Sequence, residues 1–113
     1  MQTYQNFIGG EWITSQSAKR VPNINPANGE TLGEVPLSSR DEALTAVEMA
    51  AQAFKTWRKV PAPKRGAIVT QAAQLMKERR NEIARALSRE EGKLLSEAHG
   101  ELNRTINIME FCG

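Results

Sequence analysis

The sequence predicts two β-hairpins at the amino-terminal end, followed by three α-helices. In the first third of the 113 residues, short apolar runs alternate with turns that contain glycine or proline. In the remainder, apolar residues recur at steps of three and four, which is the period of an amphipathic helix. We therefore divide the chain into a β-hairpin region over residues 1–36 and a helical region over residues 37–113.

The first hairpin is predicted at Gly9-Gly10, between strands over residues 5–8 and 11–14. Two successive glycines can both adopt positive φ, which a two-residue turn between twisted strands requires. We therefore expect the chain to reverse direction at this pair.

The second hairpin is predicted between strands over residues 20–25 and 31–35. Pro26 presets φ near the start of the connecting turn, and Asn28-Gly29 tolerates left-handed geometry. This turn should be longer than the first one.

The first helix is predicted to begin after Ser39, because residues 39–42 fit a capping box. In that motif the Ser39 hydroxyl accepts a hydrogen bond from the N–H of Glu42, and the Glu42 carboxylate accepts one from the N–H of Ser39. The apolar residues that follow share one helix face: Leu44, Val47, Ala51 and Phe54.

The second helix is predicted to open near Pro63, which a first turn accepts, and to end at Gly92. Glycine suits the left-handed conformation that often follows a helix. Ser96 is the predicted cap of the third helix. The apolar stripes comprise Ile68, Ala72, Leu75, Met76, Ile83 and Leu87 in the second helix, and Ala98, Leu102, Ile106 and Met109 in the third.

Residues 106–113 are apolar on more than one side of the predicted helix. A helix of this kind is normally buried, and the preceding residues offer no obvious partner for all its sides. We therefore expect the natural polypeptide to continue beyond Gly113.

The net charge is only +2, but residues 55–80 hold eight basic residues and one acidic residue. Such a run either contacts phosphate groups or forms a solvated helix face and a loop. We favour the solvated face and predict no binding to nucleic acid. The basic residues are Lys55, Arg58, Lys59, Lys64, Arg65, Lys77, Arg79 and Arg80.

Cys112 is the only cysteine, so the chain has no internal disulfide, which fits a reducing compartment. No apolar run approaches the roughly 18 residues of a membrane span. The amino-terminal residues also lack the pattern of a signal peptide. We predict a cytoplasmic protein with no membrane association.

The residues themselves predict no catalytic or cofactor-binding site in this chain. A nucleophilic Cys112 would need a neighbouring base, but His99 lies thirteen residues away on the same predicted helix. We interpret Cys112 as a buried structural cysteine and His99 as a surface residue. Glu90 and Glu91 are adjacent and would point to different helix faces. The sequence also lacks two glycine-rich patterns that bind nucleotides, Gly-x-x-x-x-Gly-Lys-Ser/Thr and Gly-x-Gly-x-x-Gly.

Six segments resemble, in the right order, the amino-terminal part of NAD(P)-dependent aldehyde dehydrogenases. Each segment is weakly specific, but together they cover essentially residues 7–113. The most informative is Arg89–Glu101, which resembles the junction of two helices in that family. The segments are residues 7–12, 25–30, 46–57, 63–68, 78–84 and 90–101.

The resemblance implies an α/β fold and an enzyme that oxidises an aldehyde to a carboxylic acid with NAD or NADP. It implies that residues 1–113 belong to the amino-terminal, cofactor-binding domain of a longer chain, and that the catalytic cysteine and glutamate lie beyond them. Cys112 does not match the nucleophile. This segment would be structural and inactive alone. Its partners would be the remainder of the chain and, in the parent enzyme, further copies in a dimer or tetramer.

Two finer expectations come from the same resemblance. The segment around Glu90 is similar to the branch that oxidises α-ketoglutaric semialdehyde. Many family members also bind a monovalent cation, Na⁺ or K⁺. Its ligands here would be the backbone carbonyls of Asn23 and Ile24 and the carboxylate of Glu90.

A different class of function stays open on the residues alone. The chain could be a stand-alone helical module that binds a protein partner through its third helix. The reading frame beyond Gly113 would separate this alternative from the dehydrogenase.

Overall fold

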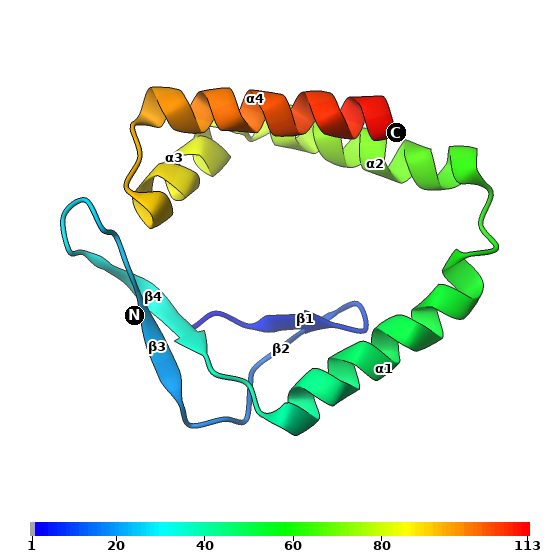
Figure 1. Cartoon of the computed structure of the whole chain (residues 1–113), viewed down its shortest axis with the longest axis horizontal. Coiled ribbons are helices and arrows are strands. Elements are labelled where there is room, and N and C mark those ends of the chain that lie inside the picture. Colours follow the sequence, from blue (N-terminus) through cyan, green and yellow to red (C-terminus); the bar gives the residue numbers. More distant parts are fainter. Residues whose placement is uncertain (1) are drawn as a thin grey trace. The chain divides into compact units, whose positions relative to one another are not determined.

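The computed structural model describes residues 2–113 and shows, within them, two antiparallel hairpins and four helices (Figure 1). The predicted order, hairpins before helices, is confirmed, but the helices number four rather than three. The elements are β1 (Asn6–Ile8), β2 (Glu11–Ile13), β3 (Arg20–Ile24), β4 (Thr31–Pro36), α1 (Arg40–Trp57), α2 (Ala62–Glu78), α3 (Arg80–Glu91) and α4 (Leu95–Cys112).

The chain divides into two units, which do not coincide with the hairpin and helical regions. One unit extends to Ile24 and resumes over Glu30–Lys59, so that α1 belongs with the hairpins. The other contains Asn25–Gly29 and Val60–Gly113, and therefore α2, α3 and α4. No helix among the described residues is long and apolar enough to cross a membrane.

The first hairpin forms at the predicted glycine pair. Gly9 and Gly10 have φ values of +63° and +87°, and Ile8 pairs with Glu11 across the turn. One step further from the turn, Phe7 lies opposite Trp12, with ring centroids 5.0 Å apart. Both rings are largely exposed, so this pair packs on itself and leaves its outer surface free.

The second hairpin also forms as predicted, and the amino-terminal residues extend it. The Glu34 N–H donates to the Gln2 carbonyl at 2.8 Å, and the Tyr4 N–H donates to the Glu34 carbonyl at 3.0 Å. Gly33 permits this close approach, because a Cβ there would lie 2.7 Å from the Gln2 carbonyl oxygen. The register between β3 and β4 changes by one residue at Asn23, where β4 contains an unpaired residue.

The capping box at the start of α1 is confirmed, and its acidic residue, Glu42, also binds groups outside the helix. Glu42 accepts hydrogen bonds from the N–H of Ser39 at 2.7 Å and from the N–H of Gln16 at 2.8 Å. The Ser15 hydroxyl also donates to it, at 3.0 Å. These donors favour the ionised carboxylate and lower the pKa of Glu42 below its ordinary value of 4.5. One side chain thus fixes the start of α1 to the segment that follows the first hairpin.

The apolar stripe predicted for α1 is present, but residues 2–113 do not bury it. The helix has no buried residue, and Leu44, Val47 and Phe54 are 43%, 65% and 58% exposed. An amphipathic helix normally covers such a stripe. This face is therefore available to a surface outside the described residues.

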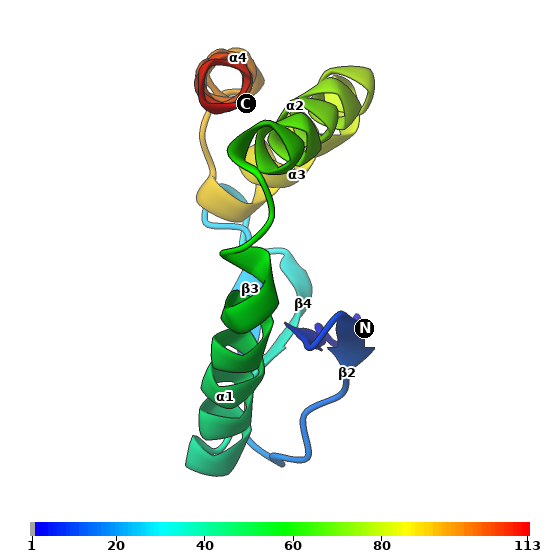
Figure 2. The same cartoon turned by 90° about the vertical axis from the view of Figure 1, so that its right-hand side faces the viewer.

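The second unit has a core made around α4. Figures 1 and 2 show α4 lying along α2 and α3. Fully buried alanines of α2, α3 and α4 let the helices approach closely. The buried residues are Ala73, Ala84, Ala98, Leu102 and Ile106, with Met76, Ile83, Leu87 and Met109 packed against them.

The prediction of one long second helix is wrong, because α2 ends at Glu78 and α3 begins at Arg80. Arg79 lies between them with φ −98° and ψ 17°, and its guanidinium holds the Glu82 carboxylate, with an Nη2–Oε1 distance of 2.6 Å. Neither glycine nor proline causes the break. Figure 2, which looks along α4, shows α2 crossing it obliquely, so a change of direction lets both helices contact α4.

The link from α3 to α4 has the predicted glycine. Gly92 is left-handed, with φ +74°, and its N–H donates to the Ser88 carbonyl at 2.8 Å. The prediction that Ser96 caps the next helix is wrong. Helix α4 begins at Leu95, and the Glu97 carboxylate instead accepts from the Leu94 N–H at 3.3 Å. Glu97 thus satisfies the Leu94 N–H, while the apolar side chain of Leu94 accepts no hydrogen bond from the first turn.

Substituting Gly92→Ala should destabilise the chain by at least about 1 kcal/mol, because an L-residue in the left-handed region costs about that much. The added Cβ would also lie 2.7 Å from Cγ of Pro26. Urea unfolding measures the change. Gly100→Ala is the matched control: it lies within α4 with nothing within 4 Å, and should stabilise by about 0.5–1 kcal/mol. Equal stability of Gly92→Ala and the native chain would contradict the assignment.

Substituting Glu42→Gln should destabilise the fold at neutral pH and much less in acid. The folded-state pKa is lowered, so the stabilisation is fully present above the ordinary pKa of 4.5 and is lost as the pH falls through the lowered value. Thermal unfolding of both proteins between pH 7 and pH 3 tests this. Glu48→Gln, on the same helix and exposed, is the control. A Glu42→Gln deficit that stayed constant with pH would refute the role of the charge.

Candidate functional site

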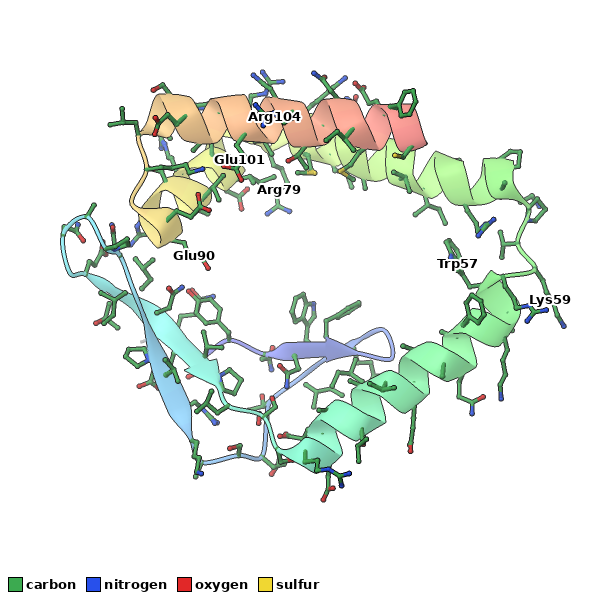
Figure 3. The ribbon with its side chains drawn as sticks, viewed as in Figure 1. Trp57, Lys59, Arg79, Glu90, Glu101 and Arg104 are labelled. Carbon is green, nitrogen blue, oxygen red and sulfur yellow. The ribbon has the colours of Figure 1, made fainter. Side chains whose placement is uncertain are left out.

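The residues predicted to bind a monovalent cation lie in different units. Asn23 is half-buried on β3, and its amide donates to the Tyr4 hydroxyl at 3.3 Å. Ile24 follows at the change of register and is 47% exposed. Glu90 lies in the last turn of α3 and is exposed (Figure 3). The cation site therefore stays a prediction. Among residues 2–113, no three His, Cys, Asp or Glu side chains gather where they could hold a metal.

The thiol of Cys112 is exposed. Cys112 is exposed at the last position of α4, so the interpretation of a buried structural cysteine is wrong for this chain. It lies six residues beyond Ile106, the last buried residue of the helix, where the described core has ended. His99 is half-buried near the other end of α4, about 20 Å away along the helix axis. The two side chains cannot form a nucleophile–base pair.

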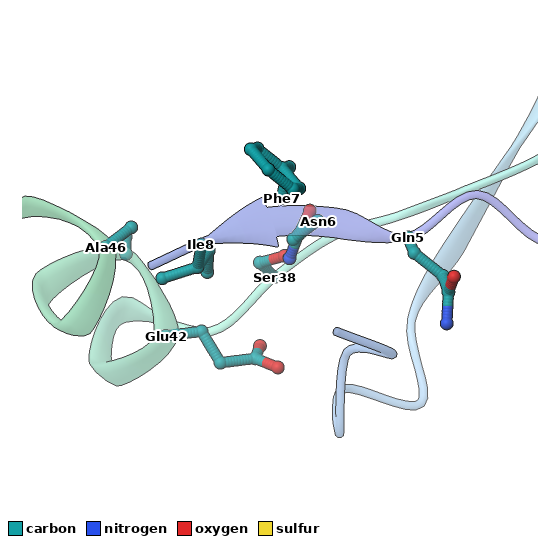
Figure 4. A pocket seen from close by; sticks show the side chains of 8 residues that line it. Gln5, Asn6, Phe7, Ile8, Ser38, Glu42 and Ala46 are labelled. Atoms are coloured by element: carbon teal, nitrogen blue, oxygen red, sulfur yellow. The ribbon is translucent and has the colours of Figure 1, made fainter. Parts of the chain in front are cut away.

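A hollow of about 390 Å³ lies in the first unit between β1 and the start of α1 (Figure 4). Its polar groups already have partners: Glu42 as described, and Asn6, whose amide donates to the Ser38 hydroxyl at 2.7 Å. The rest of the lining is largely apolar, so the hollow suits a packed side chain better than a charged ligand. It is lined by Gln5, Asn6, Phe7, Ile8, Ser38, Glu42, Ala43 and Ala46.

A second hollow, of about 730 Å³, follows one face of α4 in the second unit. Its helical positions recur at steps of three and four, on a face other than the one that enters the core. Gly100 leaves space there, since nothing lies within 4 Å of where its Cβ would be. The lining residues are Lys93, Glu97, Gly100, Glu101, Arg104, Thr105 and Ile108.

Most charges beside this α4 hollow are already paired. The Lys93 ammonium contacts the carboxylates of Glu101 and, at 2.8 Å, of Glu91. The hydrogen bond that the ammonium donates to Glu101, and then the one it donates to Glu91, raise the pKa of Lys93 above its ordinary value of 10.5. Glu97 accepts from the backbone at the start of α4. Within residues 2–113, the exposed Arg104 has no hydrogen bond or ion pair, so its guanidinium is free to bind an anion.

Arg104 was not among the residues that the sequence predicted for a site. The periodic signal was present, because Glu97, Glu101, Arg104 and Ile108 share a helix face. The pattern could not show that the two acidic residues on this face already have partners, Glu97 at the Leu94 N–H and Glu101 at Lys93. Figure 3 shows Glu101 and Arg104 on α4.

A sequence model of the aldehyde dehydrogenase family matches residues 12–113. The chain belongs to the aldehyde dehydrogenase family. Malonate-semialdehyde dehydrogenase 2 of Geobacillus kaustophilus is 48% identical to it over 111 residues, which are 98% of this chain and 23% of that protein. The chain thus spans about a quarter of the length of this curated relative.

Solved aldehyde dehydrogenase structures share the fold. NADP-dependent glyceraldehyde-3-phosphate dehydrogenase from Bacillus halodurans, complexed with NADP, has a TM-score of 0.93 at 30% identity, over 98% of this chain and 23% of that one. NAD-dependent benzaldehyde dehydrogenase from Corynebacterium glutamicum has a TM-score of 0.89 at 34% identity, over 94% and 23%. The predicted fold class, the amino-terminal part of an α/β aldehyde dehydrogenase, is confirmed.

Proposed function

We propose that the protein to which this segment belongs oxidises an aldehyde that carries a carboxylate, a semialdehyde, to the corresponding acid with NAD or NADP. Family membership supports aldehyde oxidation, and the name of the Geobacillus kaustophilus relative supports a semialdehyde. The two similar structures are described as NAD-dependent and NADP-dependent, so both cofactors fit the family. The family match also favours this function over a stand-alone interaction module.

The segment's main role in this proposal is structural support of the cofactor-binding domain. The uncovered stripe of α1 and two exposed residues of α4, Ile108 and Phe111, at 56% and 92% exposure, are apolar surfaces that the rest of the chain would cover. The catalytic and cofactor-binding residues would lie outside residues 1–113. We place the enzyme in the cytoplasm. We also expect a dimer or tetramer, which the native mass of the purified enzyme would test.

A second role concerns substrate recognition. The guanidinium of Arg104 presents a planar set of N–H donors that matches the two oxygens of a carboxylate. It lies on the α4 hollow and is unpaired within residues 2–113. We therefore assign Arg104 to binding the carboxylate of the semialdehyde. This guanidinium, unpaired within residues 2–113, is the single structural observation that supports the proposed substrate class.

Two semialdehydes are compatible with this recognition. The resemblance noted in the sequence predicts α-ketoglutaric semialdehyde, whereas the relative named above is a malonate-semialdehyde dehydrogenase. Both carry a carboxylate, so Arg104 would serve either. The ratio of kcat/KM for the two aldehydes decides between them, and a preference for simple aliphatic aldehydes would remove both.

Substituting Arg104→Gln in the full-length enzyme should raise the KM for the semialdehyde about 10- to 100-fold, because a hydrogen bond to a charged group contributes about 1.5–3 kcal/mol. The KM for propionaldehyde, which has no carboxylate, should change little. Steady-state NAD(P)H formation measures both. An equal loss with both aldehydes would remove the assignment of Arg104.

In the same assay the isolated 113 residues should form no NAD(P)H.

The cation site is the remaining proposal. Carbonyl and carboxylate oxygens are hard ligands that suit Na⁺ or K⁺. We expect the thermal stability of the full-length enzyme to rise with added K⁺ or Na⁺ relative to a large organic cation at equal ionic strength. Glu90→Gln should weaken this response, whereas Glu78→Gln, at the end of α2, should not. No ion-specific response in the native enzyme would end the proposal.

A further inference from the structure

We propose that Lys93 is a positioning residue that keeps Arg104 available to substrate by holding Glu101 away from it. The inference rests on the proposed recognition of a carboxylate by Arg104. It concerns residues of one unit only, at the end of α3, in the link that follows it and on α4. It also gives a purpose to an ion-pair cluster that the proposed function leaves unexplained.

Glu101 and Arg104 are natural competitors for pairing. They are three residues apart on α4, a spacing at which side chains of opposite charge are neighbours on the helix surface. Both line the α4 hollow. A pair between them would neutralise the guanidinium and occupy its donors. In the structure Glu101 contacts the Lys93 ammonium instead, and Arg104 forms no pair within residues 2–113.

Lys93 is well held for this task. Gly92 turns the chain out of α3, and the Ser88 hydroxyl donates to the Lys93 carbonyl at 2.7 Å, which fixes the backbone. The Lys93 side chain is only 25% exposed, and Glu91 also contacts the ammonium, at 2.8 Å. A cation fixed at its base and at its head competes better for Glu101 than a flexible exposed guanidinium does.

The raised pKa of Lys93 is consistent with this arrangement. The two carboxylates favour the charged ammonium, so the lysine stays protonated at any pH where the enzyme would work. Glu97, the other acid beside the α4 hollow, is held by the backbone N–H of Leu94. Among residues 2–113, Arg104 is then the charge beside the α4 hollow that remains unpaired.

The test uses the full-length enzyme with malonate semialdehyde and propionaldehyde as substrates. Lys93→Met frees Glu101, so the KM for malonate semialdehyde should rise about two- to fivefold, the range by which one exposed ion pair shifts an affinity. The KM for propionaldehyde and both kcat values should change less. Adding Glu101→Gln to Lys93→Met removes the competitor and should restore the native KM. Lys93→Arg should also retain it.

A matched control is Lys77→Met. Lys77 also pairs with a carboxylate of α4, that of Glu110, but it does not line the α4 hollow. The Lys77→Met substitution should leave the KM for malonate semialdehyde at its native value. If Lys77→Met raised that KM as much as Lys93→Met does, general loosening of α4 would be the cause and the inference would fail.

The remaining outcomes also decide the matter. If Lys93→Met lowers activity on both aldehydes equally and Glu101→Gln does not rescue it, Lys93 is merely structural. Should Lys93→Met not fold, Lys93→Gln carries the same expectation, and failure of both variants to fold overturns the inference. If Arg104→Gln leaves the KM for the semialdehyde unchanged, the proposed function itself fails. If Arg104→Gln raises it and Lys93→Met does not, only this inference fails.

Discussion

The second unit depends on one backbone constraint, the left-handed conformation of Gly92 between α3 and α4. It ends α3 with a closing hydrogen bond and directs the chain back so that α4 can pack on α2 and α3. The turn residue Pro26 packs against this glycine, with no room for a side chain between them. Because Lys93 is the next residue, the same constraint sets where its ammonium lies relative to Glu91 and Glu101.

Helix α4 serves two purposes with different faces. Ala98, Leu102 and Ile106 enter the core, and the small alanines around them allow close helix packing. A neighbouring face carries Glu101 and Arg104 beside the α4 hollow. The core holds α4 in place, so the charges on the other face keep fixed positions. The role proposed for Arg104 requires such a fixed position, because a recognition residue must be held by the element that carries it.

Carboxylates organise both units, though in different ways. Glu42 gathers backbone and hydroxyl donors, so its charge fixes the start of α1 to the segment after the first hairpin. Glu101 is paired with Lys93, and we propose that this pairing keeps its carboxylate from binding Arg104. The first unit meanwhile leaves the apolar stripe of α1 exposed. The chain spans 23% of its Geobacillus kaustophilus relative, and we propose that residues outside it cover this stripe.

The sequence by itself determined the elements whose causes are local. Gly9-Gly10 specified a tight turn, Ser39 and Glu42 a helix start, and Gly92 a helix end, because each depends on the conformation or hydrogen bonding of a few adjacent residues. Tertiary structure alone decided the break at Arg79 and the unpaired state of Arg104 within residues 2–113. The first depends on how α2 and α3 both reach α4, and the second on which acids are paired across the α3–α4 link. Neither leaves a signal in local spacing, because the deciding partners are brought together only by the fold.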